Sequence, residues 1–514
     1  MSVRIRISED SVAIALGADA LATALAQAAA QHGESLEIIR VSSRGLYWLE
    51  PLIEVDTGQG SFGYGPLAVS DVESLLAAGF LQGAAHPLAL GPVESLPFLE
   101  RQQRLLFARA GKTRPLSLDD YLASGGYAGL KRVLAAGGDA FMAELEASGL
   151  RGRGGAAFPA HLKWATVRGA ASGERFVVCN ADEGDSGAYA DRMLMEGDPY
   201  ALIEGMTIAA LCVGARHGYI YVRSEYPQAI AKLQAAIGHA RAAAYLGDDV
   251  LGSGQAFELE VRQGAGAYIC GEESALLESI EGKRGQVRAR PPLPASHGLF
   301  GRPTLVHNVL SLASIPIIAR DGGAAFYHFG RERSRGTLPL TLGGCLQHGG
   351  LVETAFGLSL RTLLYDFGAG AKNGEIKAVQ VGGPLGAWIT ASDFDLLIDY
   401  EAFAAHGAIL GHGSVVAVDA SCDMAGMARL AFTFCAAESC GKCTPCRIGS
   451  VRGGEIIDRL RDGSAQHDQD VALLLELCDT MRDGSLCALG GMLHYPVRSA
   501  LTLFPDAFPK WRAK

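Results

Sequence analysis

The fold is decided by the stretch Arg151-Gly-Arg-Gly-Gly-Ala-Ala-Phe-Pro-Ala-His-Leu-Lys163-Trp164. Its glycines let backbone N–H groups come close to a bound group, and its basic side chains add positive charge, so the pattern favours a phosphate. Gly152-x-Gly154-x-x-Ala157 resembles the dinucleotide-binding fingerprint, but that motif needs a strand directly before it. Residues 130–150 have helical spacing instead. The stretch therefore predicts a phosphate loop outside the standard fingerprint, or alternatively a flexible surface loop.

Length and charge limit the class of protein. A chain of 514 residues is too long for one core and predicts several domains. Its 45 Lys and Arg are scattered and are outnumbered by 55 Asp and Glu, which gives a net charge of −10. This distribution argues against nucleic acid as a partner.

Apolar residues form no run of about 18, the length that indicates a membrane span. The first ten residues carry Arg4, Arg6, Glu9 and Asp10 where a signal peptide would have its apolar region. We expect a soluble cytoplasmic protein with no membrane span.

The first part of the chain, 1–105, has the alternation of a small α/β domain. Strands are expected at Ser11–Leu16, Leu36–Val41 and Leu52–Val55, and helices at Asp19–His32 and Ser70–Ala78. The order is typical of a thioredoxin-like domain. Redox chemistry in such a domain needs cysteines, and this region has none.

Strands and helices alternate over residues 106–335, which predicts a Rossmann-like α/β domain with ligands at the carboxyl ends of its strands. Strands are expected at Arg175–Cys179, Tyr219–Val222 and Phe257–Val261. Helices are expected at Pro199–Val213, Tyr226–Tyr245, Glu272–Glu281 and Val306–Ile318.

The last two regions differ sharply in pattern. Residues 336–420 are β-rich with Gly-Gly turns and predict a β-grasp (ubiquitin-like) module, in which Pro339 would place the strand Leu338–Leu342 at an edge. Residues 421–514 predict a helical bundle, with helices expected at Met424–Ala436, Val451–Arg461, Asp468–Met481 and Leu489–Leu501.

Cysteine spacing carries the strongest chemical signal. Six of the eleven cysteines lie between Cys435 and Cys487, among them the run Glu438-Ser-Cys440-Gly-Lys-Cys443-Thr-Pro-Cys446-Arg447. Three thiols at this spacing can reach three corners of one cubane cluster, and a distant Cys487 would complete it. Four thiolates also suit zinc, which usually prefers two paired knuckles, so we favour the cluster over zinc. Cys422, Cys435 and Cys478 have apolar or helical settings and are expected as core thiols.

Two loops follow expected strands. Asn180-Ala-Asp182-Glu183-Gly-Asp185 would repel a phosphate but suits sugar hydroxyls and ring N–H groups; a solvated loop is the alternative. The loop Gly264–Gly271 contains Tyr268, which could stack on a planar ring, and leads into Glu272 and Glu273, which could simply favour a helix dipole.

From about Leu130 onward the chain resembles the NADH-oxidising flavin subunit of complex I and its relatives in NAD-reducing hydrogenases and NAD-dependent formate dehydrogenases. The resemblance rests on four motifs, at residues 149–159, 179–183, 264–273 and 438–447. It implies that FMN is held by Gly152, Arg153, Gly154, Lys163, Asn180, Asp182, Glu183, Gly271, Glu272, Val306 and Asn308. It implies an NAD(H) pocket lined by Phe158, Glu183, Asp185, Tyr268 and Glu273, and a 4Fe–4S cluster on Cys440, Cys443, Cys446 and Cys487.

The chain departs from the family at several positions. Ala157 stands where a glycine is usual, and Leu293 where a phenylalanine is usual, which removes one aromatic contact. Residues 307–311 read His-Asn-Val-Leu-Ser where Asn-Asn-Val-Glu-Thr is usual; Ser311 keeps a hydroxyl for the flavin phosphate.

Residues 1–105 resemble the small thioredoxin-like subunit of the same enzymes, fused here to the flavin subunit. In that subunit four cysteines hold a two-iron cluster; Ala15, Ala20, Ser43 and Tyr47 stand at those positions here. We therefore expect no cluster in this domain, which would serve as a docking surface.

The implied chemistry is hydride transfer between NAD(H) and FMN, with FMN exchanging single electrons with the cluster. No side chain need act as nucleophile or base; Glu183 is a candidate for tuning the flavin. The fused chain most resembles the β (diaphorase) subunit of a molybdenum formate dehydrogenase. Its partners would be a molybdenum- and iron–sulfur-containing catalytic subunit and a small 2Fe–2S thioredoxin-like subunit. The alternatives are a hydrogenase diaphorase, a complex I flavin subunit, and a zinc-stabilised scaffold or nucleotide sensor without turnover.

Overall fold

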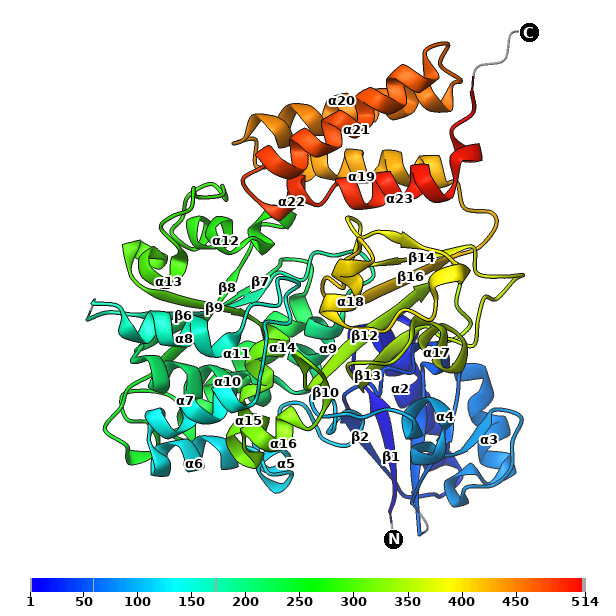
Figure 1. The fold of residues 1–514 in the computed structure, drawn as a ribbon. Coiled ribbons are helices and arrows are strands. Elements are labelled where there is room, and N and C mark those ends of the chain that lie inside the picture. Colours follow the sequence, from blue (N-terminus) through cyan, green and yellow to red (C-terminus); the bar gives the residue numbers. More distant parts are fainter. Residues whose placement is uncertain (1, 59, 172, 511–514) are drawn as a thin grey trace.

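The computed structural model describes residues 2–58, 60–171 and 173–510, so Met1 and residues 511–514 of the expected first and last domains lie outside it. The described residues form three sheets of four or five strands and a two-stranded ribbon. Figure 1 shows helices around the sheets and a separate group of helices at the carboxyl end. The chain is thus a mixed α/β protein of several layers. Within the described residues, no helix combines the length and apolar character needed to cross a bilayer.

The first sheet has the strand order β2-β1-β3-β4-β5. Strand β1 is parallel to its neighbour β2, which follows helix α2, and antiparallel to the central strand β3. The expected strand at Ser11–Leu16 was wrong: Asp10 caps a short helix there by accepting a hydrogen bond from the N–H of Val12 at 2.8 Å. The elements are β1 (Val3–Ser8), α1 (Ser11–Ala15), α2 (Ala18–Gln31), β2 (Leu36–Val41), β3 (Ile53–Thr57), β4 (Gly60–Tyr64), α3 (Val72–Ala78) and β5 (Ala89–Pro92).

Short helices lead from this sheet to the glycine-rich stretch. Helix α7 ends at Ala147 and helix α8 begins at Ala160, so the stretch connects two helices, as its non-strand context predicted. The segment contains α4 (Pro97–Glu100), α5 (Leu118–Ala123), α6 (Ala128–Ala136), α7 (Gly138–Ala147) and α8 (Ala160–Gly169).

The second sheet is parallel throughout, with the order β8-β7-β6-β9. The apolar helix α10 is buried almost along its whole length beneath it, and helices α9 and α11 pack on the same layer. The helix expected at Val306–Ile318 begins only at Val309, because residues 304–308 pair with β6 as strand β9. The elements are β6 (Phe176–Ala181), α9 (Ala190–Gly197), α10 (Pro199–Val213), β7 (His217–Val222), α11 (Pro227–Ala242), β8 (Glu258–Gln263), α12 (Glu273–Ile280), α13 (Pro294–His297), β9 (Thr304–Asn308), α14 (Val309–Ala313), α15 (Ile315–Asp321) and α16 (Gly323–Tyr327).

The third sheet has the order β13-β12-β16-β14-β15. Strand β12 is internal, so the edge position expected from Pro339 was wrong. Pro339 is tolerated because pairing with β16 begins only at Thr341. On the other side the carbonyl of Glu353, opposite Pro339, accepts from the N–H of Gln103 at 3.0 Å and so needs no donor from the proline. The elements are the β10–β11 ribbon (Gly330–Arg331 and Ser334–Arg335), β12 (Thr337–Gly344), β13 (Gly350–Ala355), α17 (Leu360–Thr362), β14 (Ala378–Val381), β15 (Trp388–Ile389), α18 (Tyr400–Ala405) and β16 (Ser414–Val418).

The carboxyl-terminal helices pack on one another above β14, β16 and α12, at the top of Figure 1. Phe432, Ile457, Leu474 and Leu493 form part of their shared core. The loop between α21 and α22 carries Cys487 back toward the parallel sheet. The helices are α19 (Met424–Glu438), α20 (Thr444–Arg461), α21 (His467–Gly484), α22 (Ala488–Gly491) and α23 (His494–Leu503).

Candidate functional site

The glycine-rich stretch closes on itself as a compact loop. The N–H of Gly152 donates to the carbonyl of Phe158 at 2.8 Å, and Arg151 Nε donates to the carbonyl of Ala157 at 2.6 Å. Ala157 adopts a left-handed backbone with φ of 50°, a conformation that glycine takes at lower cost. The loop is therefore closed by its own hydrogen bonds, which favours an ordered ligand-binding loop over a flexible surface loop.

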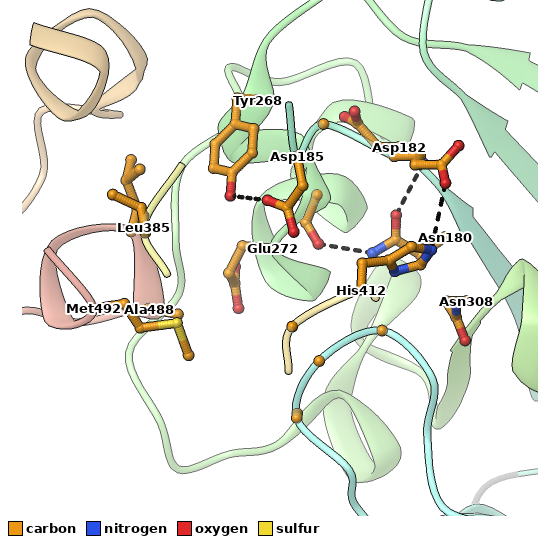
Figure 2. Close-up of a pocket in the computed structure, with 18 of the residues that line it drawn as sticks. Asn180, Asp182, Asp185, Tyr268, Glu272, Asn308, Leu385, His412, Ala488 and Met492 are labelled. Atoms are coloured by element: carbon orange, nitrogen blue, oxygen red, sulfur yellow. Dashed lines mark hydrogen bonds and ion pairs between the residues drawn. The ribbon is translucent and has the colours of Figure 1, made fainter. Parts of the chain in front are cut away.

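Two adjoining cavities lie against this loop. The inner cavity (about 240 Å³) is drawn in Figure 2, and the outer cavity (about 440 Å³) opens beside it. Their shared wall comes from the glycine loop, the ends of β6 and β9, the start of α12 and the loop before α22. It consists of Gly154, Ala156, Asn180, Gly271, Glu272, Asn308, Cys487 and Ala488.

Most residues expected to hold FMN or NAD(H) line these cavities. Asp182, Glu183, Asp185 and Tyr268 line the inner cavity alone. Gly152, Phe158, Lys163, Glu273 and Val306 line the outer cavity alone. These residues come from four separate chain segments, 152–163, 180–185, 268–273 and 306–308, which lie together around the two cavities.

Arg153 has a different position from the one its charge suggested. Its guanidinium is fully buried, donates to the carbonyls of Arg151 and Arg335, and lies over the ring of Phe356. Its backbone N–H donates to Ser311 Oγ at 2.8 Å. Arg153 therefore packs against the back of the loop, and its guanidinium points toward the third sheet.

Asn308 and Ser311 mark the place where the cavity fits a ligand. Asn308 caps helix α14 with Oδ1 accepting from the N–H of Ser311 at 3.1 Å, while no acceptor among the described residues reaches its buried Nδ2. A buried donor without a partner is costly, so a bound acceptor is expected there. A ligand rich in hydroxyl, carbonyl and phosphate oxygens, such as FMN, suits this wall.

The acidic loop after β6 is largely withdrawn from solvent. Glu183 is 3% exposed, and its carboxylate accepts the N–H groups of Asp191 and Arg192, each at 3.0 Å. Burial raises the pKa of Glu183 and that of Asp182 to about 7. Asp185 accepts a hydrogen bond from Tyr268 Oη at 2.8 Å, as Figure 2 shows. The loop is a structured wall rather than a solvated turn.

The start of α12 serves structure and cavity together. Glu272 caps the helix by accepting from the N–H groups of Ser274 and Ala275, both at 2.9 Å. Glu273 pairs with Lys163 Nζ at 3.0 Å across the outer cavity, and Arg290 pairs with both glutamates. A cation and a carboxylate therefore face each other where the phosphate was expected.

Two cavity residues, Asp191 and His412, were missed by the sequence reasoning. Asp191 lies on α9, and His412 lies in the turn before β16; His412 Nε2 is 3.1 Å from Asp191 and 3.6 Å from Glu183. The sequence did offer one signal for His412, the turn Gly411-His412-Gly413. Like the other site loops, this turn places a polar residue beside glycines.

The four predicted cluster ligands line a third, small cavity. Cys440, Cys443 and Cys446 surround it from the start of α20, and Cys487 closes it from the opposite loop. All four are free thiols, and the donor set suits a 4Fe–4S cluster. Cys487 borders all three cavities, so it also forms part of the wall of the inner and outer cavities.

Among the expected core thiols, Cys435 and Cys478 are buried and Cys422 is partly exposed. Cys435 has a special position, with Sγ 3.7 Å from Cys446 Sγ and 3.6 Å from the carbonyl of Leu489. It therefore lies directly behind a predicted cluster ligand.

Comparison with known proteins identifies the family. Residues 145–317 match the Nuo51 FMN-binding domain, and residues 426–510 match the NADH-ubiquinone oxidoreductase-F iron–sulfur binding region. The chain belongs to this family of flavin and iron–sulfur subunits. It is an NADH-binding oxidoreductase subunit whose cofactors are FMN and a 4Fe–4S cluster.

Several members of the family are similar over most of their length. The chain is 42% identical over 410 residues to the NADP-reducing hydrogenase subunit HndC of Solidesulfovibrio fructosivorans, covering 80% of this chain and 83% of that protein. It is 38% identical over 399 residues to a subunit of the NADH-quinone oxidoreductase of Escherichia coli, covering 77% and 89%. The crystal structure of an air-oxidised NAD+-reducing [NiFe]-hydrogenase aligns with all of this chain and 86% of its own, with a TM-score of 0.70 and 28% identity.

Proposed function

We propose that this chain is a diaphorase subunit that reduces NAD+ with electrons delivered by a partner subunit, most specifically one that oxidises formate. The observation that carries the diaphorase part is the position of Cys487, which borders both the cluster cavity and the two cavities of the flavin site. Ile269, Leu486 and Leu489 likewise line the cluster cavity and one of the flavin-site cavities, so electrons would cross only a short distance.

We assign a role to each expected site residue according to the cavity that it lines. FMN would supply the hydride and single-electron chemistry when bound. Asn308, Lys163 and the backbone of residues 152–155 would hold its polar groups beside the outer cavity. Phe158, Glu183, Asp185, Tyr268 and Glu273 would orient the nicotinamide nucleotide, and the close packing around the inner cavity would exclude water. Cys440, Cys443, Cys446 and Cys487 would ligate the cluster.

The proposed domain division is 1–105, 106–335, 336–420 and 421–514. The strand orders of the first and third sheets support a thioredoxin-like and a β-grasp architecture for the first and third domains, respectively. The parallel sheet supports a Rossmann-like second domain. Tyr47, which stands at an expected ligand position of the first domain, hydrogen-bonds through its hydroxyl to Arg192 at 2.7 Å, which supports a structural role for that domain.

The formate partner rests on the fusion of a cysteine-free amino-terminal domain to the flavin subunit. The named relatives equally support two alternatives, a hydrogenase diaphorase and the NADH-oxidising subunit of a quinone reductase. A molybdenum-containing catalytic subunit and a small 2Fe–2S subunit are the partners of the first proposal.

Purification of the tagged complex tests the partner directly. We expect NAD+ reduction with formate and none with hydrogen, and molybdenum in the co-purified catalytic subunit. NAD+ reduction with hydrogen, or NADH oxidation by a quinone alone, would select the corresponding alternative. A colourless, zinc-containing preparation would contradict the whole assignment, because FMN and iron–sulfur centres absorb visible light.

A further inference from the structure

The two half-reactions of a diaphorase flavin differ in what they do with a proton. Hydride transfer from NADH places two electrons and one proton together at flavin N5. The cluster accepts electrons only. When the flavin is reoxidised through the cluster, its N5–H bond breaks, the electron pair leaves as two single electrons, and the proton must go elsewhere. This inference rests on the proposed function.

A group of three ionisable side chains in the inner cavity is placed to receive that proton. Glu183, Asp191 and His412 present their carboxylate and imidazole atoms within 4.8 Å of one another. His412 lies between the two carboxylates, 3.1 Å from Asp191 and 3.6 Å from Glu183. All three residues line the cavity whose wall includes the expected FMN ligands Gly154, Asn180 and Asn308.

A hydroxyl from a residue that does not line the cavity also contacts this group. Tyr226 Oη donates to Glu183 Oε2 at 3.1 Å and belongs to a half-buried residue that forms no part of the cavity wall as defined by its lining residues. On the other side, Glu183 Oε1 is the atom that His412 approaches. The two oxygens of Glu183 thus face different directions, one toward His412 and the cavity and one toward Tyr226.

We propose that Glu183, Asp191 and His412 form the proton-exchanging group of the flavin site. It takes up the N5 proton when electrons leave through the cluster and returns a proton when electrons arrive, with Tyr226 passing the proton to and from solvent. No other oxidant or reductant is required beyond the electron carriers of the diaphorase reaction.

The charges around the group support this role. Burial lowers the pKa of His412, but Asp191, Glu183 and Asp185 outweigh burial and raise it to about 10. Burial and the charge of Asp191 raise the pKa of Glu183 to about 7, while His412 opposes that rise. Glu183 is therefore the member that gains and loses a proton near neutrality, and His412 is its cationic partner. The other ionisable side chains that face the group are Cys179, Asp185, Tyr189 and Tyr226.

The decisive experiment separates the two half-reactions in the holoenzyme. In double-mixing stopped flow, one equivalent of NADH first bleaches the flavin, and ferricyanide then reoxidises it by single electrons. His412→Gln removes the cation that favours the ionised form of Glu183, so more of Glu183 is already protonated and cannot take up the N5 proton. We expect it to slow the second step at least about 10-fold more than the first, since general acid–base groups contribute about 100-fold or more. Imidazole added to the buffer should restore the second step.

A second variant works from outside the cavity. Tyr226→Phe removes only the hydroxyl that donates to Glu183 from outside the cavity wall. We expect it to slow reoxidation selectively and to increase the solvent isotope effect of that step in D2O. If His412→Gln fails to retain FMN, this variant alone decides: equal rates for wild type and Tyr226→Phe in both steps would overturn the proposal.

A measurement without turnover completes the test. The flavin midpoint potential of the wild type, followed against pH by spectroelectrochemistry, should change slope near the titration of Glu183. Loss of the imidazolium in His412→Gln should move this break to higher pH. An unmoved break, or equal slowing of both half-reactions, would overturn the proposal.

His307 provides the matched control. It is a buried histidine at the outer cavity that accepts from Trp164 Nε1 at 2.9 Å, and burial together with Lys163 lowers its pKa to about 3. It is neutral near pH 7, so His307→Gln should leave the break in place and show no rescue by imidazole. Because NADH and ferricyanide replace the physiological partners, failure of formate to donate electrons would affect the proposed function and leave this test intact.

Discussion

At the residue scale, Lys163 and Arg290 are the cations that line the outer cavity among the described residues, and Lys163 lies on the helix that follows the glycine loop. Its Nζ lies 3.0 Å from Glu273 and 3.1 Å from the carbonyl of Val306, and Lys163 is held on the first turn of α8. We predict that Lys163→Ala weakens FMN retention about 10-fold or more, because it removes a charge-assisted hydrogen bond. The flavin-to-protein ratio after gel filtration measures this effect.

Arg168 on the same helix is the control for that prediction, since it pairs with the exposed Asp139 away from the cavities. Arg168→Ala should retain FMN like the wild type. Iron content should stay unchanged in both variants, because neither residue borders the cluster cavity. Full FMN retention in Lys163→Ala would show that another group binds the phosphate.

Glu50 gives a pH-dependent prediction of stability. Burial raises its pKa to about 7, while hydrogen bonds from Ser43 and the N–H of Leu52 oppose the rise. The folded state thus binds this proton more tightly than the unfolded state, so ionisation costs stability progressively as pH rises from about 4.5 to about 7. The cost is at most about 3 kcal/mol.

Glu50→Gln removes that cost but loses one acceptor, worth about 1 kcal/mol. We therefore predict a variant less stable than the wild type at about pH 5 and more stable at about pH 8. Urea unfolding at both pH values measures the crossing. The exposed Glu37→Gln should stay within about 0.5 kcal/mol of the wild type at both pH values.

Sequence motifs predicted some residues of the candidate site and missed others. Cysteine spacing predicted four thiols that line one cavity, because cluster geometry limits which spacings can serve it. His412 and Asp191 escaped prediction because their position depends on how a turn before β16 and helix α9 approach each other. No local periodicity encodes that approach.

At the element scale, helix α9 fastens the first sheet to the parallel sheet. Arg192 Nη1 pairs with Glu196 at 3.0 Å on its own helix and with Asp10 at 3.2 Å at the start of α1. Both carboxylates are buried. Arg192→Leu would leave two buried charges unpaired, and we predict a loss of about 3–5 kcal/mol in the free energy of unfolding.

The loss of stability in Arg192→Leu should be greatest in α1 and α9, the two helices that Arg192 joins. Hydrogen exchange should accelerate in α1 and α9 more than in α20, which lies in the distant helical group. Arg4→Ala, which breaks an exposed pair with Glu37, is the control and should change little. Uniform acceleration across the chain would contradict a local fastening role.

Element boundaries followed the sequence where the pattern was long. Helix α10 spans Pro199–Val213 as predicted, since fifteen residues with a proline at the start and Gly214 at the end leave little ambiguity. Short apolar runs were misread: 306–308 became a strand through pairing with β6, and 11–15 became a helix through the Asp10 cap. Tertiary pairing and single caps decide such segments.

At the scale of the whole molecule, the three cavities are built from segments far apart in the chain. Five segments lie together around the inner and outer cavities. They are the glycine loop, the ends of β6 and β9, the turn before β16 and the loop carrying Cys487. The sequence motifs predicted most of these segments separately. Their convergence follows from the parallel sheet, which brings the carboxyl ends of β6 and β9 to one edge.

In the proposed function the cluster is the route by which electrons pass between flavin and partner, beside the shared wall at Cys487, and this gives the last prediction. Cys443→Ser removes one ligand from the cluster cavity but no residue from the two other cavities. We expect the holocomplex to lose its 4Fe–4S signal in electron paramagnetic resonance and its partner-driven NAD+ reduction. NADH should still bleach the flavin, because hydride transfer needs no cluster. Cys422→Ser, a partly exposed thiol outside the cavity, should retain all three properties. Partner-driven NAD+ reduction that persists in cluster-free Cys443→Ser would show that electrons reach the flavin by another path.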